Sequence, residues 1–373
     1  MVGLLLLALA LLLSGHVSGK VATKDLVEYP DLFIIGAQKC GTTSLNNLLF
    51  EHKEICSKGV KEKHFYTESK YESMVKDYLA EFEGCKANQL TVDATPKYVV
   101  GSEVAERIRA SYKPETLAKK RFVLLLRDPV ARQYSEYQRV LRICFRIIEG
   151  DKQLDRVSTT RTPEEKKERA EKNCELVMRP FDSKKGGKAA SSVFKKENAM
   201  TFAEWAVSPF GSYEQARGNY VHQIRHWLTV INRSQLFILN FQSLIGNTSD
   251  SMMRLSSFLN IQYKEFLETA GDPTKSKVVL PQPPASNTYV EWEPAFMDCK
   301  THDVLATYYA EQNRGLYELI NNDPARPRVE PFFPPFSSAR GKCKMSPKDA
   351  PIGSSGAGIS SKSNVTSSLR VVR

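Results

Sequence analysis

The chain has 373 residues, of which 41% are hydrophobic and 25% are charged. This composition is ordinary for a globular protein. The chain is long enough to bury the core of one large α/β domain or of two small ones, which excludes a small peptide-like protein. The formal net charge of +11 fits an anionic partner, such as nucleic acid, a membrane, a nucleotide or an acidic polysaccharide, or it serves solubility alone.

An apolar run opens the chain at residues 2–13. It has the length of the hydrophobic region of a signal peptide and is too short to span a bilayer comfortably. Small residues at 17–19 suit cleavage before Lys20, so we expect residues 1–19 to be a signal peptide, with a short uncleaved membrane anchor as the alternative. Either interpretation predicts a secretory-pathway protein, in the Golgi lumen or secreted. Three N-x-[ST] sequons agree, at Asn232, Asn247 and Asn364.

Seven cysteines are compatible with disulfides in that compartment, and the odd number leaves at least one unpaired within the chain. Cys40 is the candidate for the free thiol. Connectivity does not follow from sequence, and the pairs that we consider are Cys144 with Cys174, Cys56 with Cys85, and Cys299 with Cys343.

Apolar runs alternate with helical patterns from residue 32 onward. The run at 32–37 ends in glycine and is typical of a buried parallel strand, after which Thr42 and Thr43 can cap a helix over 44–51. The clearest strand is 121–129, and Pro129 suits the first turn of a helix to about residue 148. Further strands are expected at 89–96 and 235–241, and further helices at 71–82, 102–110, 249–259 and 301–320. The stretch 213–231 is amphipathic. This alternation predicts an α/β fold with a parallel, doubly wound sheet.

The region 149–200 interrupts the alternation, because it is dense in Lys, Glu and Arg and holds few apolar residues. We interpret it as a charged insertion, either a solvated surface loop or a basic flap over an anionic substrate. The folded domain is expected to span 30–330. Beyond it, the Pro, Ser, Gly and Lys content of 331–373 predicts a flexible tail.

The sequence GAQKCGTTSL, residues 36–45, follows the first strand and has the glycine spacing of a phosphate-binding loop. Backbone N–H groups and the positive end of a helix dipole make such a turn a site for phosphate or sulfate. In ATP-binding P-loops a lysine follows the second glycine and the next Ser or Thr binds Mg²⁺, whereas here Thr42 follows Gly41 and the lysine is Lys39. The loop therefore favours a P-loop-like three-layer fold, a central parallel sheet flanked by helices, that binds an anionic donor without a metal. A simple glycine-containing turn is the alternative.

A second segment, RDPVARQYSEY at residues 127–137, begins at the end of the strand expected at 121–129. Arg127 lies at the carboxyl end of a parallel strand, where ligands of such sheets bind, and Ser135 is two helical turns further on. A guanidinium and a hydroxyl together suit a terminal phosphate. The alternative is a structural ion pair between Arg127 and Asp128.

Together the two segments resemble the cofactor motifs of sulfotransferases that use 3′-phosphoadenosine-5′-phosphosulfate (PAPS). GAQKCGTTSL is similar to the 5′-phosphosulfate loop and RDPVARQYSEY to the 3′-phosphate motif, and the resemblance covers roughly 31–145 and 213–320. It is closest to the Golgi carbohydrate sulfotransferases, namely the heparan sulfate N- and 3-O-enzymes and the N-acetylgalactosamine 4-sulfate 6-O type. It implies that Lys39 stabilises the leaving phosphate and that Arg127 and Ser135 bind the 3′-phosphate. The implied phosphosulfate site comprises Lys39, Cys40, Gly41, Thr42, Thr43 and Ser44.

The segment KEKHFY, residues 61–66, is similar to the E-x-H-F stretch of the heparan group. The resemblance implies that Glu62 is the general base that takes the proton of the acceptor hydroxyl, a role that contributes about 10²–10⁴-fold to the rate. His64 is the alternative base, because cytosolic relatives use histidine, and residues two apart share a face of an extended segment. Both residues could instead be ordinary surface charges.

Other positions are compared with the same family. Tyr220 opens a helix where relatives approach the cofactor, so it is expected either to contact the donor or the acceptor, or to belong to the core. Trp292 could line the adenine or sugar site, and Thr95 could hold the donor loop, residues 36–45. The chain departs from the heparan pattern at Ala94, where a lysine is usual, and at Thr67, where an aspartate is usual. The heparan C-L-x-x-S-K-G-R loop has no counterpart near residues 281–299.

These features predict an enzyme that transfers a sulfuryl group from PAPS to a hydroxyl or amine of a carbohydrate. The expected acceptor is an anionic, glycosaminoglycan-like polysaccharide; no metal and no nucleic acid are expected, and the membrane is a partner only if the N-terminal segment stays uncleaved. The alternatives are a P-loop nucleotide kinase and a catalytically inactive, secreted glycan-binding protein.

Overall fold

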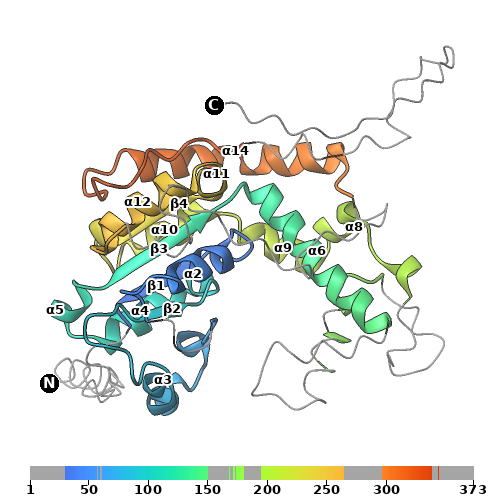
Figure 1. The fold of residues 1–373 in the computed structure, drawn as a ribbon. Helices are drawn as coiled ribbons and strands as arrows, with labels where there is room; N and C mark the ends of the chain where they lie inside the picture. The colour runs from blue at the N-terminus through green and yellow to red at the C-terminus, as the bar shows by residue number, and fades with distance from the viewer. Residues whose placement is uncertain are drawn as a thin grey trace, which may run out of the picture.

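A four-stranded parallel sheet forms the centre of the protein (Figure 1). The computed structural model describes residues 30–56, 58, 61–149, 168, 171–172, 174–179, 195–263, 296–337 and 343. The strand order is β2-β1-β3-β4, and every neighbouring pair is parallel. The strands are β1 (Leu32–Gly36), β2 (Val92–Ala94), β3 (Arg121–Leu126) and β4 (Leu236–Asn240). All four expected strands are thus present, and the predicted parallel sheet is confirmed.

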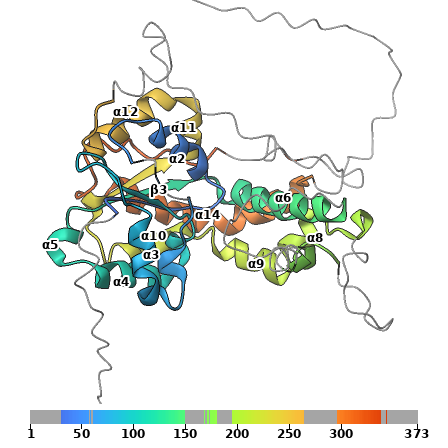
Figure 2. The same cartoon turned by 60° about the horizontal axis from the view of Figure 1, so that its bottom comes forward.

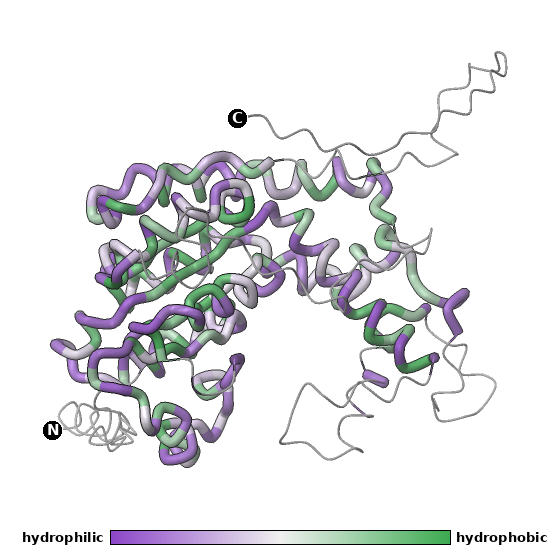
Figure 3. The backbone as a smooth tube through the Cα atoms, in the orientation of Figure 1, coloured by the Kyte–Doolittle hydropathy of each residue, from purple (hydrophilic) through white to green (hydrophobic). Residues whose placement is uncertain are grey.

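The strands are apolar along their whole length because helices cover both faces of the sheet. β1, β3 and β4 read LFIIG, RFVLLL and LFILN, and all of these residues except Arg121 are buried. Figure 3 shows the same continuous hydrophobic character along β3. Strands that alternate polar and apolar residues would expose one face, so this pattern specifies a buried parallel sheet.

Two layers of helices enclose the sheet, which confirms the predicted three-layer α/β fold (Figure 2). One face carries α2 (Thr42–Phe50), α11 (Phe241–Gly246) and α12 (Thr248–Leu259), and the other carries α4 (Ser102–Ser111) and α10 (Tyr220–Trp227). The helical pattern at 71–82 forms a 3₁₀ turn, η2 (Tyr71–Met74), followed by α3 (Val75–Ala80). Shorter elements are η1 (Phe65–Thr67), η3 (Tyr98–Val100), α5 (Pro114–Leu117) and η8 (Arg233–Gln235).

A second, helical core lies beside the sheet. The long helix α6 (Pro129–Ile148) carries the chain away from the carboxyl end of β3 to α8 (Phe202–Ala206) and α9 (Pro209–Ala216), as Figure 1 shows. Buried aromatic side chains, including Tyr137 and Trp205, fill this core. α14 (Cys299–Asn321) joins the two cores, because Tyr309 packs in the helical core and Leu316 packs in the core of the sheet.

Three disulfides are present, and each was among the pairs considered from sequence. Cys56 bonds to Cys85, Cys144 to Cys174, and Cys299 to Cys343, which leaves Cys40 as the free and buried cysteine. The Cys144 disulfide brings part of the charged insertion into the helical core, where Val177 and Ala199 are fully buried. A short turn, η7 (Lys196–Asn198), precedes Ala199. The insertion is therefore not surface loop throughout.

The amphipathic stretch at 213–231 comprises two helices, because α9 ends at Ala216 and α10 begins at Tyr220, where a helix was expected to open. Gly218 lies in the break, where a Cβ atom would lie 2.6 Å from the hydroxyl oxygen of Tyr309. This close approach of two chain segments requires glycine, and a continuous helix would not produce it.

The chain stays packed past the expected domain end at residue 330, as far as Phe336, whose amide donates to the Tyr317 hydroxyl at 2.9 Å. Phe333 is 2% exposed, and its backbone amide donates to Asn321 Oδ1 at 2.8 Å. The Asn321 amide group donates in return to the Phe333 carbonyl oxygen at 3.0 Å. Residues 1–29, Trp292 and Asn364 lie outside the described residues. In the described part of the chain, no helix is both long and apolar enough to cross a membrane.

Candidate active site

The two predicted anion-binding segments meet at the carboxyl edge of the sheet. After β1 the chain crosses to β2, and after β3 it crosses in the opposite direction to β4. Ligands of open α/β sheets bind outside the strand ends at such a switch in direction. The glycine loop follows β1 and Arg127 follows the adjacent strand β3, so both lie at this point.

The loop after β1 leaves the first amides of α2 without a capping side chain. The N-cap residue is Gly41, whose φ of 90° is in the left-handed region. A Cβ atom at Gly41 would lie 2.7 Å from the Phe241 ring, so both the backbone angle and the packing require glycine. The expected capping by Thr42 and Thr43 is wrong, because α2 already begins at Thr42 and no side chain caps it. Uncapped amides at a helix N-terminus are well suited to bind an anion.

Cys40 is engaged within the protein. Its side chain is fully buried, and its backbone amide donates to the Ala37 carbonyl oxygen at 3.1 Å. Burial raises the pKa of the thiol, which keeps it neutral. We therefore no longer assign Cys40 to the donor. Thr43 is exposed and Ser44 half-buried, so these two hydroxyl groups remain candidates, whereas Thr42 is buried.

The backbone angle φ of Lys39 and the pKa of its ammonium group are both unusual. Its φ of 71° is uncommon for a residue other than glycine. Burial lowers the pKa of Lys39 to about 8. The carboxylate of Glu136 opposes this shift, and the positive charges of Arg139, Arg142 and Arg127 reinforce it. A bound anion would relieve the repulsion between these cations and favour the protonated lysine.

Arg127 is a nearly buried guanidinium, 8% exposed, without a carboxylate partner. Its Nη1 donates to the Lys39 carbonyl oxygen at 3.3 Å, and the guanidinium carbon lies 5.0 Å from the centroid of the Phe241 ring. Asp128 instead accepts a hydrogen bond from the Ala131 amide at 2.7 Å and caps α6, so the alternative ion pair is not formed. Within the described residues Arg127 makes no ion pair, and its Nε is buried without a partner. A buried cation without an ion-pair partner is well suited to bind an anion.

Ser135 lies on the side of α6 that carries arginines. It is half-buried and stands three residues after Arg132 and four before Arg139, and residues at these spacings are neighbours on a helix surface. Because Arg139 affects the Lys39 ammonium electrostatically, this side of α6 is close to the loop. The Ser135 hydroxyl makes no hydrogen bond to another described residue, which leaves it available to a ligand.

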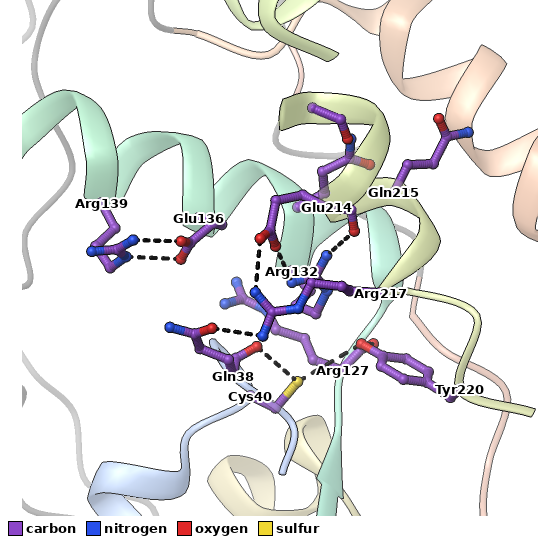
Figure 4. A network of polar contacts seen from close by, with 12 residues as sticks. Gln38, Cys40, Arg127, Arg132, Glu136, Arg139, Glu214, Gln215, Arg217 and Tyr220 are labelled. Atoms are coloured by element: carbon purple, nitrogen blue, oxygen red, sulfur yellow. Dashed lines mark hydrogen bonds and ion pairs between the residues drawn. The ribbon is translucent and has the colours of Figure 1, made fainter. Parts of the chain in front are cut away.

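A buried polar network joins α6, α9 and the loop (Figure 4). Arg132 donates to a carboxylate oxygen of Glu214 at 3.0 Å, and Arg217 donates to the other at 2.7 Å. Arg217 also donates to Gln38 Oε1 at 2.7 Å, which ties α9 to the loop. Arg132 and Glu214 are 1% and 0% exposed. The sequence does not predict this network, although Arg217 lies three residues before Tyr220, which was considered as a possible contact of the donor or the acceptor.

The network has more positive than negative charge. Next to the residues above, Arg139 forms a two-fold contact with Glu136 at 2.9 and 2.6 Å. Burial alone would raise the pKa of Glu136, but Arg139, followed by Lys39 and Arg217, lowers it overall. The arginines of Figure 4 are Arg127, Arg132, Arg139 and Arg217, and its carboxylates are Glu136 and Glu214. Lys39 adds a further cation, so the site has an excess of positive charge that a bound anion would neutralise.

The end of β2 brings Glu62 to the same edge of the sheet. The Glu62 amide donates to the carbonyl oxygen of Ala94, the last residue of β2, at 3.0 Å. The His64 amide donates to Thr95 Oγ1 at 3.4 Å, and Thr95 donates to the buried Asp93 at 2.6 Å. Thr95 therefore positions the segment of Glu62 and His64, and among the described residues it makes no hydrogen bond to the loop at residues 36–45.

The Glu62 carboxylate is strongly ionised. The His64 side chain, whose Nε2 lies 3.7 Å from Oε2, lowers the pKa of Glu62 to about 2 against an opposing effect of burial, and Lys61, 2.6 Å from Oε1, contributes. Glu62 also raises the pKa of Arg139, which places it within electrostatic range of α6. Both Glu62 and His64 have positive φ, 64° and 59°. Among the described residues, no group of three or more His, Cys, Asp or Glu side chains is arranged to hold a metal ion.

Tyr220 is buried against the loop at residues 36–45 and is shielded from solvent. It is 1% exposed, and its hydroxyl donates to the Arg127 carbonyl oxygen at 3.0 Å and lies 3.8 Å from Cys40 Sγ. Of the two expectations for this residue, the contacts agree with a place in the core.

Comparison with known proteins adds a family to this geometry. Residues 29–272, more than half of the chain, match the family described as Sulfotransferase domain. Membrane-associated sulfotransferase kil1 of Dictyostelium discoideum is 23% identical over 333 residues, which cover 79% of this chain and 66% of that protein. Heparan sulfate glucosamine 3-O-sulfotransferase 5 of Mus musculus is 32% identical over 124 residues, 33% of this chain and 34% of that protein. A solved sulfotransferase of Alicyclobacillus acidocaldarius is 18% identical, covers 79% of this chain and 97% of its own, and has a TM-score of 0.46.

Proposed function

Because the chain belongs to the sulfotransferase domain family, we propose that it transfers a sulfuryl group from PAPS to a carbohydrate. The observation that carries the proposal is the pair of anion sites at one sheet edge. One consists of Lys39 and the uncapped α2 amides, and the other is the unpaired Arg127. A donor with a phosphosulfate at one end and a 3′-phosphate at the other would occupy both.

The residues present fit such a donor. The amides of Thr42 to Ser44, the exposed Thr43 hydroxyl and the Lys39 ammonium would bind the phosphosulfate, and Arg127 with the free Ser135 hydroxyl would bind the 3′-phosphate. When bound, the donor supplies an activated sulfuryl group. Fixed positive groups that already surround the site would stabilise the charge that develops on the leaving phosphate without further rearrangement.

The transfer of the acceptor's proton is assigned to Glu62, in the segment of residues 61–66. Glu62 would take the proton of the acceptor oxygen as that oxygen bonds to sulfur, and Lys39 would neutralise the phosphate oxygen released when the sulfur–oxygen bond of the donor breaks. His64 remains the alternative base, since it lies beside Glu62. The low pKa of Glu62 makes it a weak base as long as His64 and Lys61 contact it, so an acceptor that displaces these partners would strengthen it.

The proposed acceptor is an anionic polysaccharide. The relatives include enzymes named for heparan sulfate, and the net charge of +11 suits a sulfated or uronate-bearing chain. The proposed compartment is the secretory pathway. Three disulfides favour it, and so do the sequons at Asn232 and Asn247, both of which are exposed on the surface.

Transfer of radiolabelled sulfate from PAPS to a panel of glycans tests the proposal, with Lys39→Ala and Glu62→Gln as controls. We expect transfer to at least one anionic glycan and a loss of about 10²–10⁴-fold in Glu62→Gln. Undiminished transfer by both variants would contradict the mechanism. The family match disfavours the nucleotide kinase; preferential binding of ATP with Mg²⁺ would restore it. Binding of glycans without any transfer would indicate the inactive glycan-binding protein.

A further inference from the structure

The junction between α9 and α10, residues 217–220, contacts the donor loop, residues 36–45, through two side chains. Arg217 at the start of this junction donates to Gln38 Oε1 at 2.7 Å. Tyr220 at its end lies 3.8 Å from Cys40 Sγ and donates to the Arg127 carbonyl oxygen. The two contacts flank Lys39 on both sides.

Lys39 needs such neighbours because its backbone is strained. An L-residue with φ of 71° is in a sparsely populated region, and it persists only where the surrounding structure determines it. The Cys40 amide and thiol donate to Ala37 and Gln38 carbonyl oxygens, at 3.1 and 3.8 Å, but these contacts lie within the loop itself. From outside the loop, the side chains of the flanking residues are fixed by Arg217 and Tyr220.

Arg217 is itself rigid. Its second arm bonds to Glu214, whose other oxygen bonds to Arg132, and all three of these residues are buried or nearly so. The guanidinium also lies 5.7 Å from the centroid of the Tyr213 ring. A guanidinium fixed by one carboxylate contact and one aromatic contact presents its remaining side to Gln38 in one geometry.

α14 anchors the junction in turn. Asn219 donates to the Tyr308 hydroxyl at 3.1 Å, and the Tyr309 hydroxyl donates to the Gln215 carbonyl oxygen at 2.8 Å. Gly218 allows the Tyr309 ring to approach this closely. The chain of contacts therefore leads from a long, well-packed helix to the loop.

We propose that Arg217 and Tyr220 are positioning residues of the donor loop, which hold Gln38 and Cys40 so that the strained Lys39 presents its ammonium to the donor. The inference rests on the proposed function for the identity of the donor. Neither residue is assigned a contact with the reacting atoms. If Gln38 loses its partner, Lys39 can relax to an ordinary backbone angle, and the ammonium changes its position relative to Glu136 and the arginines of α6.

The variants that isolate the contact are Gln38→Met, which keeps the shape and removes the acceptor, Arg217→Lys, and the pair combined. Gln89→Met is the matched control, because Gln89 donates to the Lys53 carbonyl oxygen at 2.9 Å and belongs neither to the loop nor to the junction. We expect kcat for sulfate transfer to fall about 10- to 100-fold in Gln38→Met, since small displacements of a charge-stabilising group have effects of that size. The combined variant should be no slower than the slower single variant, and Gln89→Met should match the parent protein.

Two further readouts separate this role from a merely structural one. Affinity for adenosine 3′,5′-bisphosphate should fall much less than kcat in Gln38→Met, and the unfolding temperature should change little. The pH dependence of Lys39 acylation, read by mass spectrometry, needs no turnover, and its midpoint should rise from about 8 in the parent to that of an ordinary lysine in Gln38→Met. A kcat within twofold of the parent, or an unchanged midpoint, would overturn the inference. Absence of bisphosphate binding and transfer in the parent would refute the proposed function, while the acylation midpoint would still decide the positioning role.

Discussion

The Arg127 guanidinium donates to the backbone carbonyl oxygen of Lys39 at 3.3 Å, so the segment that follows β3 holds the loop that follows β1. The two anion sites are thus one unit rather than two independent motifs. A change at Arg127 is expected to act both on its own ligand and on the loop.

Replacement of Arg127 by alanine should weaken donor binding. A hydrogen bond to a charged group contributes about 1.5–3 kcal/mol, which corresponds to an increase in Kd for adenosine 3′,5′-bisphosphate of roughly 10- to 100-fold. Isothermal titration calorimetry measures it. Arg121→Ala is the matched control, because Arg121 stands at the opposite end of the same strand. An equal loss of affinity in both variants would contradict the assignment.

Donor binding should weaken above pH 8. Lys39 has a pKa lowered to about 8, and a bound anion raises it, so binding takes up a proton at pH values between the free and the bound pKa. The affinity contributed by Lys39 is complete below pH 8 and falls by up to tenfold per pH unit above it. Calorimetry with the bisphosphate from pH 6.5 to 9.5 checks this. Lys39→Met should bind more weakly and lose the slope; the same slope in the variant would assign it to another group.

The pH–rate profile should distinguish Glu62 from His64. Because the pKa of Glu62 is lowered to about 2, the carboxylate stays ionised throughout the usual assay range, and its loss as a base would not appear above pH 5. A base of the imidazole type would instead produce a fall in kcat/KM between pH 8 and 5. We expect a flat profile from pH 5 to 7 and a loss of about 10²–10⁴-fold in Glu62→Gln. An acid limb that disappears in His64→Gln would transfer the role to His64.

Phe333 should contribute to the stability of the fold although it lies beyond the domain end expected from sequence. It is 2% exposed against 67% for its neighbour Phe332. Phe333→Ala should lower the free energy of unfolding by about 3–5 kcal/mol, and Phe332→Ala should change it by less than about 0.5 kcal/mol. Denaturant titration of the two variants measures the difference. Equal effects would show that the segment after residue 330 is not packed as described.

Much of the framework was predictable because it depends on local chemistry. Buried parallel strands need continuous apolar runs, so the four strands could be located within a few residues. Pro129 marked the start of α6, and the spacing of Gly36 and Gly41 marked the loop, since few residues tolerate such turns. The charged insertion at 149–200 had no comparable local pattern.

The rest depends on residues that only folding brings together. Gln38 and Arg217 are 179 residues apart in the sequence, and neither belongs to a pattern that would announce the contact. The break between α9 and α10 and the packing of Phe333 also follow from partners elsewhere, Tyr309 and Asn321. Residue types and spacing identify which groups can bind an anion. Which of these groups remain unpaired, as Arg127 does, and which are used for internal support, as Cys40 and Tyr220 are, is settled by tertiary contacts, because only these determine where each charge and hydrogen bond finds its partner.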